Sequence, residues 1–436
     1  GLDSYRSKVV LGFICWIMFT STMSLRAMGV AYIGIVDHFT ASREDASWPG
    51  TVAMSTFGLA GPLCGYLSEI WSYHVVLVGC TVLTSMGITL CYFAPSVLFI
   101  TLFYGVLHGA TLSGVFLMTN GLSSQYFKRW YSTANGIAWS CQCISAFFIP
   151  DVANFILREL GALEIFLIIG AMTLNSFPPA LFLKSPPWAA TKKSKLAAAQ
   201  KRLPLHDLSE SPKAMLSSRE RQQELFKERE TSACMHNAVS YSQNGLERLD
   251  PESTLSEFDG TDVKPSNTNP VVMEALKAFC NFCFLFDALS YAVYFYTMTT
   301  YFLVHVDLAR DRAVVSSQAI YLQHVYSLGD FLMRLSCGFI IDRGHLTVQD
   351  AMALGFFGSA AAFEALAWSQ SMVCLLPSAL LLGLSQGILA PLPAPLLKDD
   401  FGGKSLPIMM GGVFASMGLL LMTRPPVLGI SRLLFS

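Results

Sequence analysis

Four ionisable side chains stand out within long apolar stretches of the sequence: Arg26, Asp287, Asp330 and Arg334. A charged group at the centre of a bilayer costs about 2.5 to 3.5 kcal/mol on insertion scales, so each needs a partner or a water-filled cavity. Asp330 and Arg334 are four residues apart, and a helix presents side chains at this spacing on one face. The spacing therefore predicts an ion pair within one helix.

Such a pair offers chemistry for binding an organic anion. A guanidinium group matches a planar carboxylate with two parallel hydrogen bonds, so Arg334 and Arg26 are candidate anchors. If a substrate anion engages Arg334, Asp330 loses its counter-ion and takes up a proton more readily, which would couple the two events. The alternative is a purely structural ion pair. For Asp287, a hydrogen bond to a neighbouring helix is equally open.

The segments that carry these residues are unusually apolar. Of the 436 residues, 53% are hydrophobic and 14% are charged, whereas soluble proteins carry about a quarter charged residues. The net charge of −1 gives no basic field for nucleic acid, so we expect no nucleic-acid partner. Apolar stretches long enough to cross a bilayer lie at 9–36, 48–69, 74–94, 97–123, 132–157, 162–183, 275–304, 315–340, 349–368, 372–396 and 405–424.

We therefore expect an all-α membrane protein with eleven spans. Arg424, Pro425 and Pro426 close the last stretch, so we expect that a twelfth span is missing and that the N-terminus, which begins at Gly1, is also clipped. The predicted domains are a six-span half at 1–183, a polar and largely disordered loop at 184–272, and a five-span half at 273–436. Lysine and arginine favour one set of loops, which predicts that the N-terminus and the central loop are cytoplasmic.

The two halves carry similar glycine and proline positions at a nearly constant offset, which predicts an internal repeat. The corresponding landmarks are Gly65 with Gly338, Gly105 and Gly109 with Gly383 and Gly387, and Gly136 and Pro150 with Gly412 and Pro426. Two pseudo-symmetric six-helix halves are typical of a carrier that rocks around a site between them.

Other functional classes receive less support from the sequence. The eleven cysteines form no complete metal cluster, and we expect them to pack as small apolar groups without metal or cofactor. Asp287 and Asp330 could suggest a protease dyad, but Arg334 would keep Asp330 ionised, so we expect no enzyme and no catalytic residue. A membrane sensor or scaffold that signals through 184–272 is the more serious alternative.

Three motifs together resemble those of the monocarboxylate transporter family within the major facilitator superfamily. They are TASREDASW at 40–48, YFKRWYSTANGIA at 126–138 and SLGDFLMRLSCGFIIDRG at 327–344. The resemblance implies the fold of that superfamily. It also implies that Arg26 occupies the place of a lysine in lactate-carrying members, and that Asp330 and Arg334 match the family pair in span eight.

By the same resemblance, Glu69, Asp342 and Arg343 look like the gating signature of the superfamily and its repeat. Lys128 and Arg129 remain from a basic cluster whose next two positions are here aromatic. The implied function is symport of a small monocarboxylate or related organic anion, with a proton, across the plasma membrane by alternating access. Facilitated transport of amino acids or other metabolites is the alternative. Some members require a single-span immunoglobulin-like partner.

Overall fold

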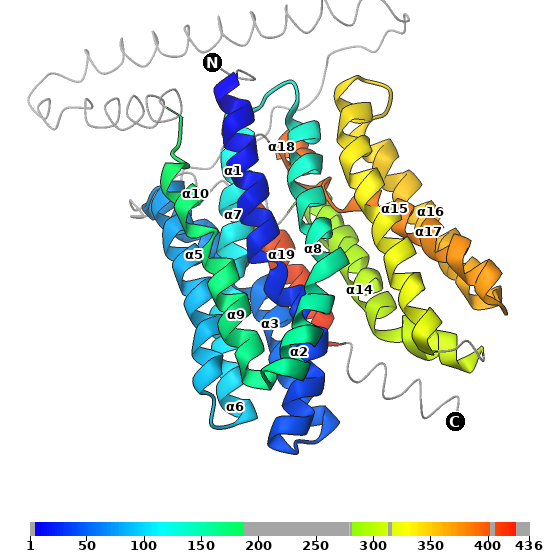
Figure 1. Cartoon of the computed structure of the whole chain (residues 1–436). Helices are drawn as coiled ribbons and strands as arrows, with labels where there is room; N and C mark the ends of the chain where they lie inside the picture. The colour runs from blue at the N-terminus through cyan, green and yellow to red at the C-terminus, as the bar shows by residue number, and fades with distance from the viewer. Residues whose placement is uncertain (1–4, 187–278, 280, 313–315, 402–405, 424–436) are drawn as a thin grey trace, which may run out of the picture. The chain divides into compact units, whose positions relative to one another are not determined.

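The computed structural model describes residues 5–186, 279, 281–312, 316–401 and 406–423, which form helices joined by short turns (Figure 1). The predicted loop at 184–272 lies outside the described residues from 187 onward, so its expected disorder stays a prediction. The part of the chain that is described supports the predicted all-helical class.

The first half consists of helices that follow the six predicted spans, several of them broken into two segments. They are α1 (Tyr5–Ser21), α2 (Met23–Phe39), α3 (Arg43–Leu59), α4 (Gly61–Ile70), α5 (Tyr73–Leu90), η1 (Cys91–Phe93), α6 (Val97–Ile100), the π-helix η2 (Thr101–His108), α7 (Gly109–Tyr126), α8 (Tyr131–Glu159), α9 (Ala162–Leu174) and α10 (Phe177–Phe182).

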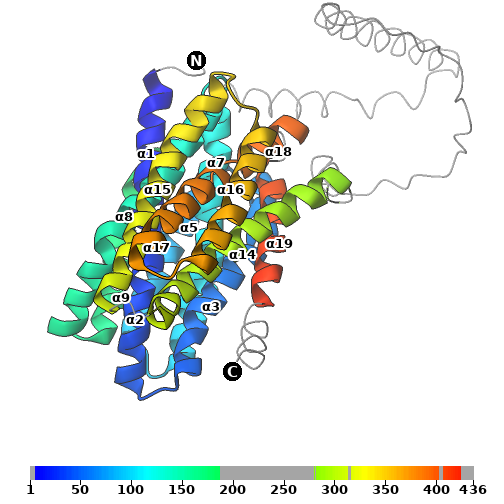
Figure 2. The same cartoon turned by 90° about the vertical axis from the view of Figure 1, so that its right-hand side faces the viewer.

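The second half contains helices at each of the five further predicted spans. They are α14 (Phe282–Asp311), α15 (Ser316–Asp342), α16 (Val348–Trp368), α17 (Met372–Leu389), α18 (Pro393–Phe401) and α19 (Leu406–Met422). Figure 2 shows α14 to α17 side by side with the helices of the first half behind them.

Among the described residues, 7 helical segments are long and apolar enough to cross a membrane. These are Tyr5–Phe39, Tyr73–Phe93, Val97–Tyr126, Tyr131–Glu159, Ala162–Phe182, Val348–Trp368 and Met372–Phe401. The other predicted spans are helical as well, as α3 with α4, α14, α15 and α19. These helices are shorter or contain more polar residues, so they are not among the 7 segments that are long and apolar enough.

Local sequence explains the breaks within two spans. Thr20 and Thr22 donate to the carbonyl oxygens of Trp16 and Met18, at 2.8 and 2.9 Å, and such bonds bend a helix. This is where α1 gives way to α2. Pro62, in the first turn of α4, lacks the N–H that would continue the ladder from α3.

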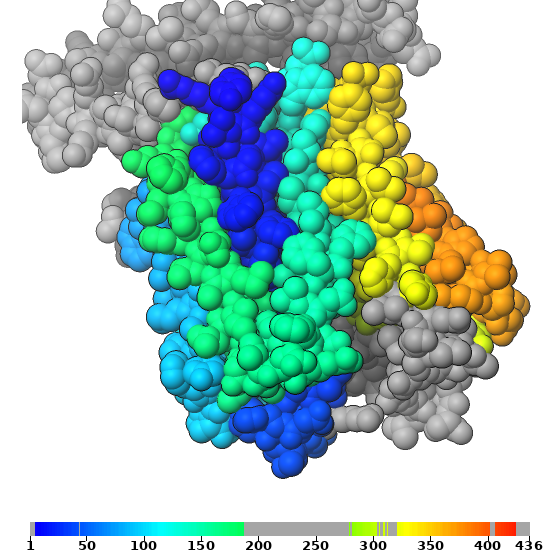
Figure 3. Space-filling view, in the orientation of Figure 1, coloured from blue at the N-terminus to red at the C-terminus, as the bar shows by residue number. Residues whose placement is uncertain are grey.

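The most extensive contacts between the halves are those of α8 with α15 and of α3 and α4 with α19. The predicted repeat relates α4 to α15 and α8 to α19, so each interface is the counterpart of the other. Figure 3 shows the surfaces of α8 and α15 next to each other on one face. The repeat deduced from glycine positions thus has a structural counterpart in the contacts.

Close approach of α8 and α15 depends on two glycines. A side chain at Gly136 would collide with the carbonyl oxygen of Arg334, and one at Gly338 would collide with that of Ser132. Small residues allow membrane helices to approach until backbones touch. These glycines therefore set the separation at which polar groups from the two halves meet.

Candidate functional site

The ion pair predicted within α15 forms. Arg334 Nε donates to Asp330 Oδ1 at 2.6 Å, and the two residues are 3% and 4% exposed. Burial on this scale makes the pair expensive unless the remaining polar atoms also find partners. The surrounding helices supply several of them.

The first half of the chain contributes contacts through α8. Arg334 Nη1 donates to the Trp139 carbonyl oxygen at 3.3 Å, and its guanidinium carbon lies 6.0 Å from the centre of the Trp139 ring. Cys143 Sγ donates to Asp330 Oδ2 at 3.3 Å. Trp139 and Cys143 are one helical turn apart, so one turn of α8 faces the turn of α15 that holds the pair.

Sequence reasoning missed both of these α8 residues. Cys143 was expected to pack as a small apolar group. This is wrong because its thiol donates a hydrogen bond to the carboxylate of Asp330. Trp139 carries no signal in the sequence that separates it from a lipid-facing aromatic. Its indole Nε1 donates to Asn120 Oδ1 at 3.3 Å, and this bond fixes the ring beside Arg334.

Arg26, on α2, lies near the same group of residues. It is partly buried, and its Nε has no hydrogen-bond partner among the described residues. Arg26 is within electrostatic range of Cys143 and Tyr294, which are also within range of Asp330 and Arg334. The structure therefore brings three of the four predicted intramembrane charges into one electrostatic environment.

Buried tyrosines surround the pair on the side of the second half. Tyr291, Tyr294 and Tyr326 are each at most 2% exposed. Within the described part of the chain, the hydroxyl groups of Tyr291 and Tyr326 have no hydrogen-bond partner. A buried hydroxyl without a partner is costly, so these two groups are candidates for contact with a bound molecule.

Aromatic rings continue from this site across both halves. The rings of Phe57 and Phe414 are 5.2 Å apart, and those of Phe116 and Trp139 are 5.5 Å apart. Phe414 also stacks on Tyr291, with centroids 6.1 Å apart and planes at 16°. An aromatic cluster thus extends from Trp139 and Tyr291, the two rings of this group near Arg334, into both halves.

Asp287, the fourth predicted intramembrane charge, lies near the start of α14. It is in the second turn of this helix, which begins at Phe282. Asp400, on α18, is within electrostatic range of Asp287. The predicted place of Asp287 inside the span at 275–304 stays a prediction.

Asp342, at the end of α15, engages the start of α8. Its carboxylate accepts hydrogen bonds from Ser132 N at 3.2 Å, from Thr133 N at 2.6 Å and from Thr133 Oγ1 at 2.6 Å. The first turn of a helix has free N–H groups and favours a negative charge. A residue of the second half therefore caps a helix of the first half.

The other residues of the predicted gate also lie at or next to the ends of helices. Glu69, near the end of α4, is in electrostatic range of Tyr73, and Gly65 on the same helix packs against the start of α19 at Pro407 and Ile408. Lys128, Arg129 and Arg343 are exposed. The guanidinium of Arg343 lies 4.2 Å from the ring centre of Phe339, its neighbour on α15.

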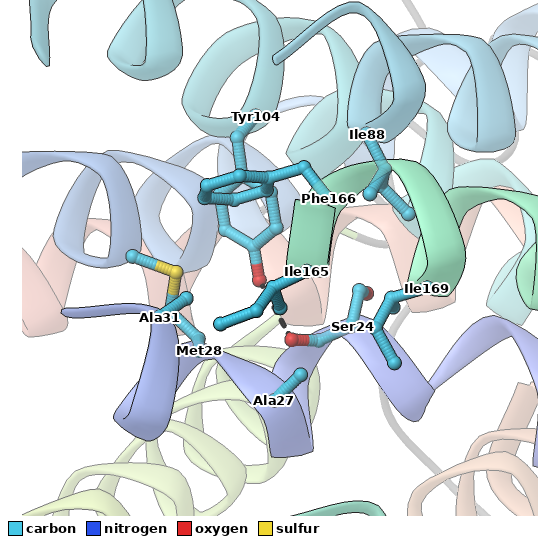
Figure 4. Close-up of a pocket in the computed structure, with 9 residues that line it drawn as sticks. All are labelled: Ser24, Ala27, Met28, Ala31, Ile88, Tyr104, Ile165, Phe166 and Ile169. Carbon is cyan, nitrogen blue, oxygen red and sulfur yellow. Dashed lines mark hydrogen bonds between the residues drawn. The ribbon is translucent and has the colours of Figure 1, made fainter. Parts of the chain in front are cut away.

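A second buried polar cluster lies within the first half. Ser24 Oγ is 3.0 Å from His108 Nε2, and the Tyr104 hydroxyl donates to the Ser24 carbonyl oxygen at 3.1 Å. Figure 4 shows the Tyr104 hydroxyl directed at Ser24, beside a small pocket that is otherwise lined mainly by apolar side chains such as Ile165 and Phe166. Because apolar side chains line most of this pocket, we assign the cluster a packing role.

Known proteins resemble this chain along much of its length. The family model described as Major Facilitator Superfamily matches residues 14–301. Monocarboxylate transporter 11 of Mus musculus is 31% identical over 160 residues, which cover 37% of this chain and 36% of that protein. Monocarboxylate transporter 11 of Homo sapiens is 30% identical over 180 residues, which cover 40% of this chain and 38% of that protein. These matches span little more than a third of those relatives.

Longer matches have lower identity. Monocarboxylate transporter 12 of Xenopus laevis is 21% identical over 426 residues, which cover 97% of this chain and 81% of that protein. The solved structure of the proton:xylose symporter XylE, bound to 6-bromo-6-deoxy-D-glucose, superimposes with a TM-score of 0.60 at 14% identity. That match covers 98% of this chain and 89% of XylE and indicates a shared fold. Its relatives include proteins named monocarboxylate transporters, and the family match shows that this chain belongs to the major facilitator superfamily.

Proposed function

We propose that this protein is a secondary transporter that moves a small monocarboxylate or related organic anion, together with a proton, by alternating access across the plasma membrane. The proposal includes a cytoplasmic N-terminus, a cytoplasmic loop at 184–272 between the two halves, and transport roles for the predicted site residues. The observation that carries it is the buried Asp330–Arg334 pair, which contacts α8 of the opposite half.

The charges around this pair suit a single anion. With Asp330 ionised, Arg26, Arg334 and Asp330 together carry a net charge of +1, which one carboxylate neutralises. A carboxylate that binds Arg334 competes with Asp330 for the same guanidinium group. Asp330 then accepts a proton more easily, because its positive neighbour is engaged elsewhere. This exchange of partners is the proposed source of coupling.

Helix-end contacts support the proposed alternating access. Asp342 joins the halves by capping α8, and Asn135 Nδ2 donates to the Pro391 carbonyl oxygen at 2.5 Å. Both contacts cross between the halves near the start of α8. We propose that they hold this end closed, that they break when the halves rock apart, and that Glu69 has the corresponding role at α19.

Reconstituted vesicles provide the test. Uptake of labelled pyruvate and lactate, together with a panel of amino acids, is measured with and without unlabelled substrate inside. A carrier shows saturable uptake that is accelerated by internal substrate, whereas a sensor or scaffold binds without flux. Preference for an amino acid with no response to pH would favour the facilitated alternative. Co-expression with a single-span immunoglobulin-like protein tests the proposed accessory partner, through delivery to the cell surface.

A further inference from the structure

We propose that Cys143 is a positioning residue for Asp330, and that its hydrogen bond forms when the two halves are closed over the site and breaks when they part. The inference rests on the proposed transport function. Cys143 belongs to α8 of the first half, and Asp330 belongs to α15 of the second. The bond between them therefore reports the relative position of the halves.

The geometry divides the two carboxylate oxygens of Asp330 between the halves. Oδ1 accepts from Arg334 Nε at 2.6 Å within α15, and Oδ2 accepts from Cys143 Sγ at 3.3 Å across the interface. The contact to Arg334 on the same helix can persist while the helices move as rigid bodies. The contact to Cys143 cannot persist if α8 and α15 separate.

Charged and titratable groups from every helix near Asp330 act on it together. Arg334 and Tyr326 lie on α15, Cys143 lies on α8, and Tyr294 lies on α14. Arg26 of α2 reaches the same cluster through Cys143 and Tyr294. Of the protein groups in this cluster, the thiol is the one shown to donate a hydrogen bond to Asp330 from the opposite half.

A donor to an ionised carboxylate favours the charged form. In the closed state the thiol therefore stabilises the ionised carboxylate of Asp330. When the halves separate, this hydrogen bond is lost. Protonation of Asp330 becomes easier at the point in the cycle when the site opens. Cys143 would in this way connect the conformation of the carrier to the proton affinity of its site.

Cys91 is a suitable control. It is 0% exposed, and Cys143 is 1% exposed. Cys91 Sγ donates at 3.3 Å to the Gly87 carbonyl oxygen in the preceding turn of the same segment. Both thiols are therefore buried hydrogen-bond donors, but only Cys143 of this pair donates across the halves.

The first measurement is the pH profile of pyruvate uptake in vesicles for the wild type, Cys143→Ala, Cys143→Ser and Cys91→Ala. We expect Cys143→Ala to move the midpoint of the profile upward by about half a pH unit or more, because the ionised carboxylate loses a donor. Cys143→Ser keeps a donor and should restore the wild-type midpoint, and Cys91→Ala should leave it unchanged. Coincident profiles for Cys143→Ala and the wild type would overturn the proposal, as would equal shifts for Ala and Ser.

The second measurement does not depend on flux. The folded wild-type protein is treated with N-ethylmaleimide, and the labelling rate of each cysteine is followed by mass spectrometry. We expect Cys143 to react at least about fivefold faster than Cys91, since a group at an opening interface is exposed more often than one inside a packed half. Equally slow labelling of both thiols would overturn the opening of this contact. Rapid Cys143 labelling without uptake of any probe would instead count against the proposed substrates.

Discussion

Trp130, which precedes α8, stacks on Phe339 of α15 with ring centroids 6.2 Å apart and planes at 17°. The guanidinium of Arg129 lies 5.3 Å from the Trp130 ring centre, and that of Arg343 lies 4.2 Å from the Phe339 ring centre. Nearby, Lys398 Nζ lies 3.8 Å from the ring centre of Tyr131. Aromatic rings thus join the two halves at positions where the family resemblance implies charges.

Replacing Trp130 by alanine should favour opening at this end. An aromatic pair contributes about 0.5 to 1.5 kcal/mol beyond its buried area, so we expect N-ethylmaleimide to label Cys143 about two- to tenfold faster in Trp130→Ala. Trp71→Ala is the control, because Trp71 is 56% exposed at the end of α4. An unchanged rate in Trp130→Ala would show that the stack does not hold the halves together.

Replacing one member of the ion pair should cost more stability than replacing both. Arg334→Met leaves Asp330 buried without its counter-ion, which should lower the free energy of unfolding by about 3 to 5 kcal/mol. The double variant Asp330→Leu with Arg334→Met removes both charges and should recover most of this loss, while uptake stays abolished. Thermal denaturation in detergent measures the first effect and vesicle uptake the second. Full uptake in the double variant would contradict a role for the pair in transport.

The response to pH should depend on Asp330. In wild-type vesicles we expect an inward proton gradient to drive uptake, because the proposed mechanism couples anion binding to uptake of a proton by Asp330. Asp330→Asn cannot change its charge, so uptake should lose its dependence on the gradient while counterflow at equal pH continues. A gradient response that is the same in Asp330→Asn and in the wild type would remove Asp330 from the coupling mechanism.

Asp342 should stabilise the closed arrangement through its cap on α8. Asp342→Ala removes three hydrogen bonds that cross between the halves, and loss of a cap costs about 0.5 to 2 kcal/mol. We expect faster labelling of Cys143 in this variant. Asp350→Ala also breaks a helix-start contact, with Thr347 at 2.6 Å, but within one helix. It should leave the labelling of Cys143 unchanged, and equal effects of the two variants would argue against a gating role.

Gly338 should be intolerant of a larger side chain. In Gly338→Leu the new atoms collide with the backbone of α8 at Ser132 and Thr133, and overpacking costs about 1 to 3 kcal/mol. Gly79 on α5 has no heavy atom within 4 Å of the position of an added Cβ, so Gly79→Leu is the control. The apparent unfolding temperature should fall in the first variant only. Equal unfolding temperatures for the two variants would mean that α8 and α15 can move apart without loss of stability.

The sequence contained enough to predict the helices and the ion pair, because both follow from local rules. Apolar length predicts a span, and a spacing of four residues predicts that Asp330 and Arg334 meet. The contacts of Cys143 and Trp139 depend on how α8 is positioned along α15, and no local pattern encodes this register.

The aromatic contacts between the halves were also beyond sequence reasoning. Trp130 and Tyr131 could be interpreted only as two missing charges in a basic cluster. A ring can take the place of a charge when another ring or a cation lies against its face, and this arrangement is visible only when Phe339 and Lys398 are placed beside them.

The two interfaces between the halves are counterparts under the predicted repeat, but they differ in what they contain. Along α3 and α4 against α19, backbone meets backbone: a Cβ at Gly58 would lie 2.5 Å from Gly418 Cα, and one at Gly61 would lie 2.6 Å from the Gly411 carbonyl oxygen. Along α8 against α15 lie the carboxylate, the guanidinium and the thiol. The two interfaces are therefore chemically unequal, because the buried ionisable groups gather at only one of them.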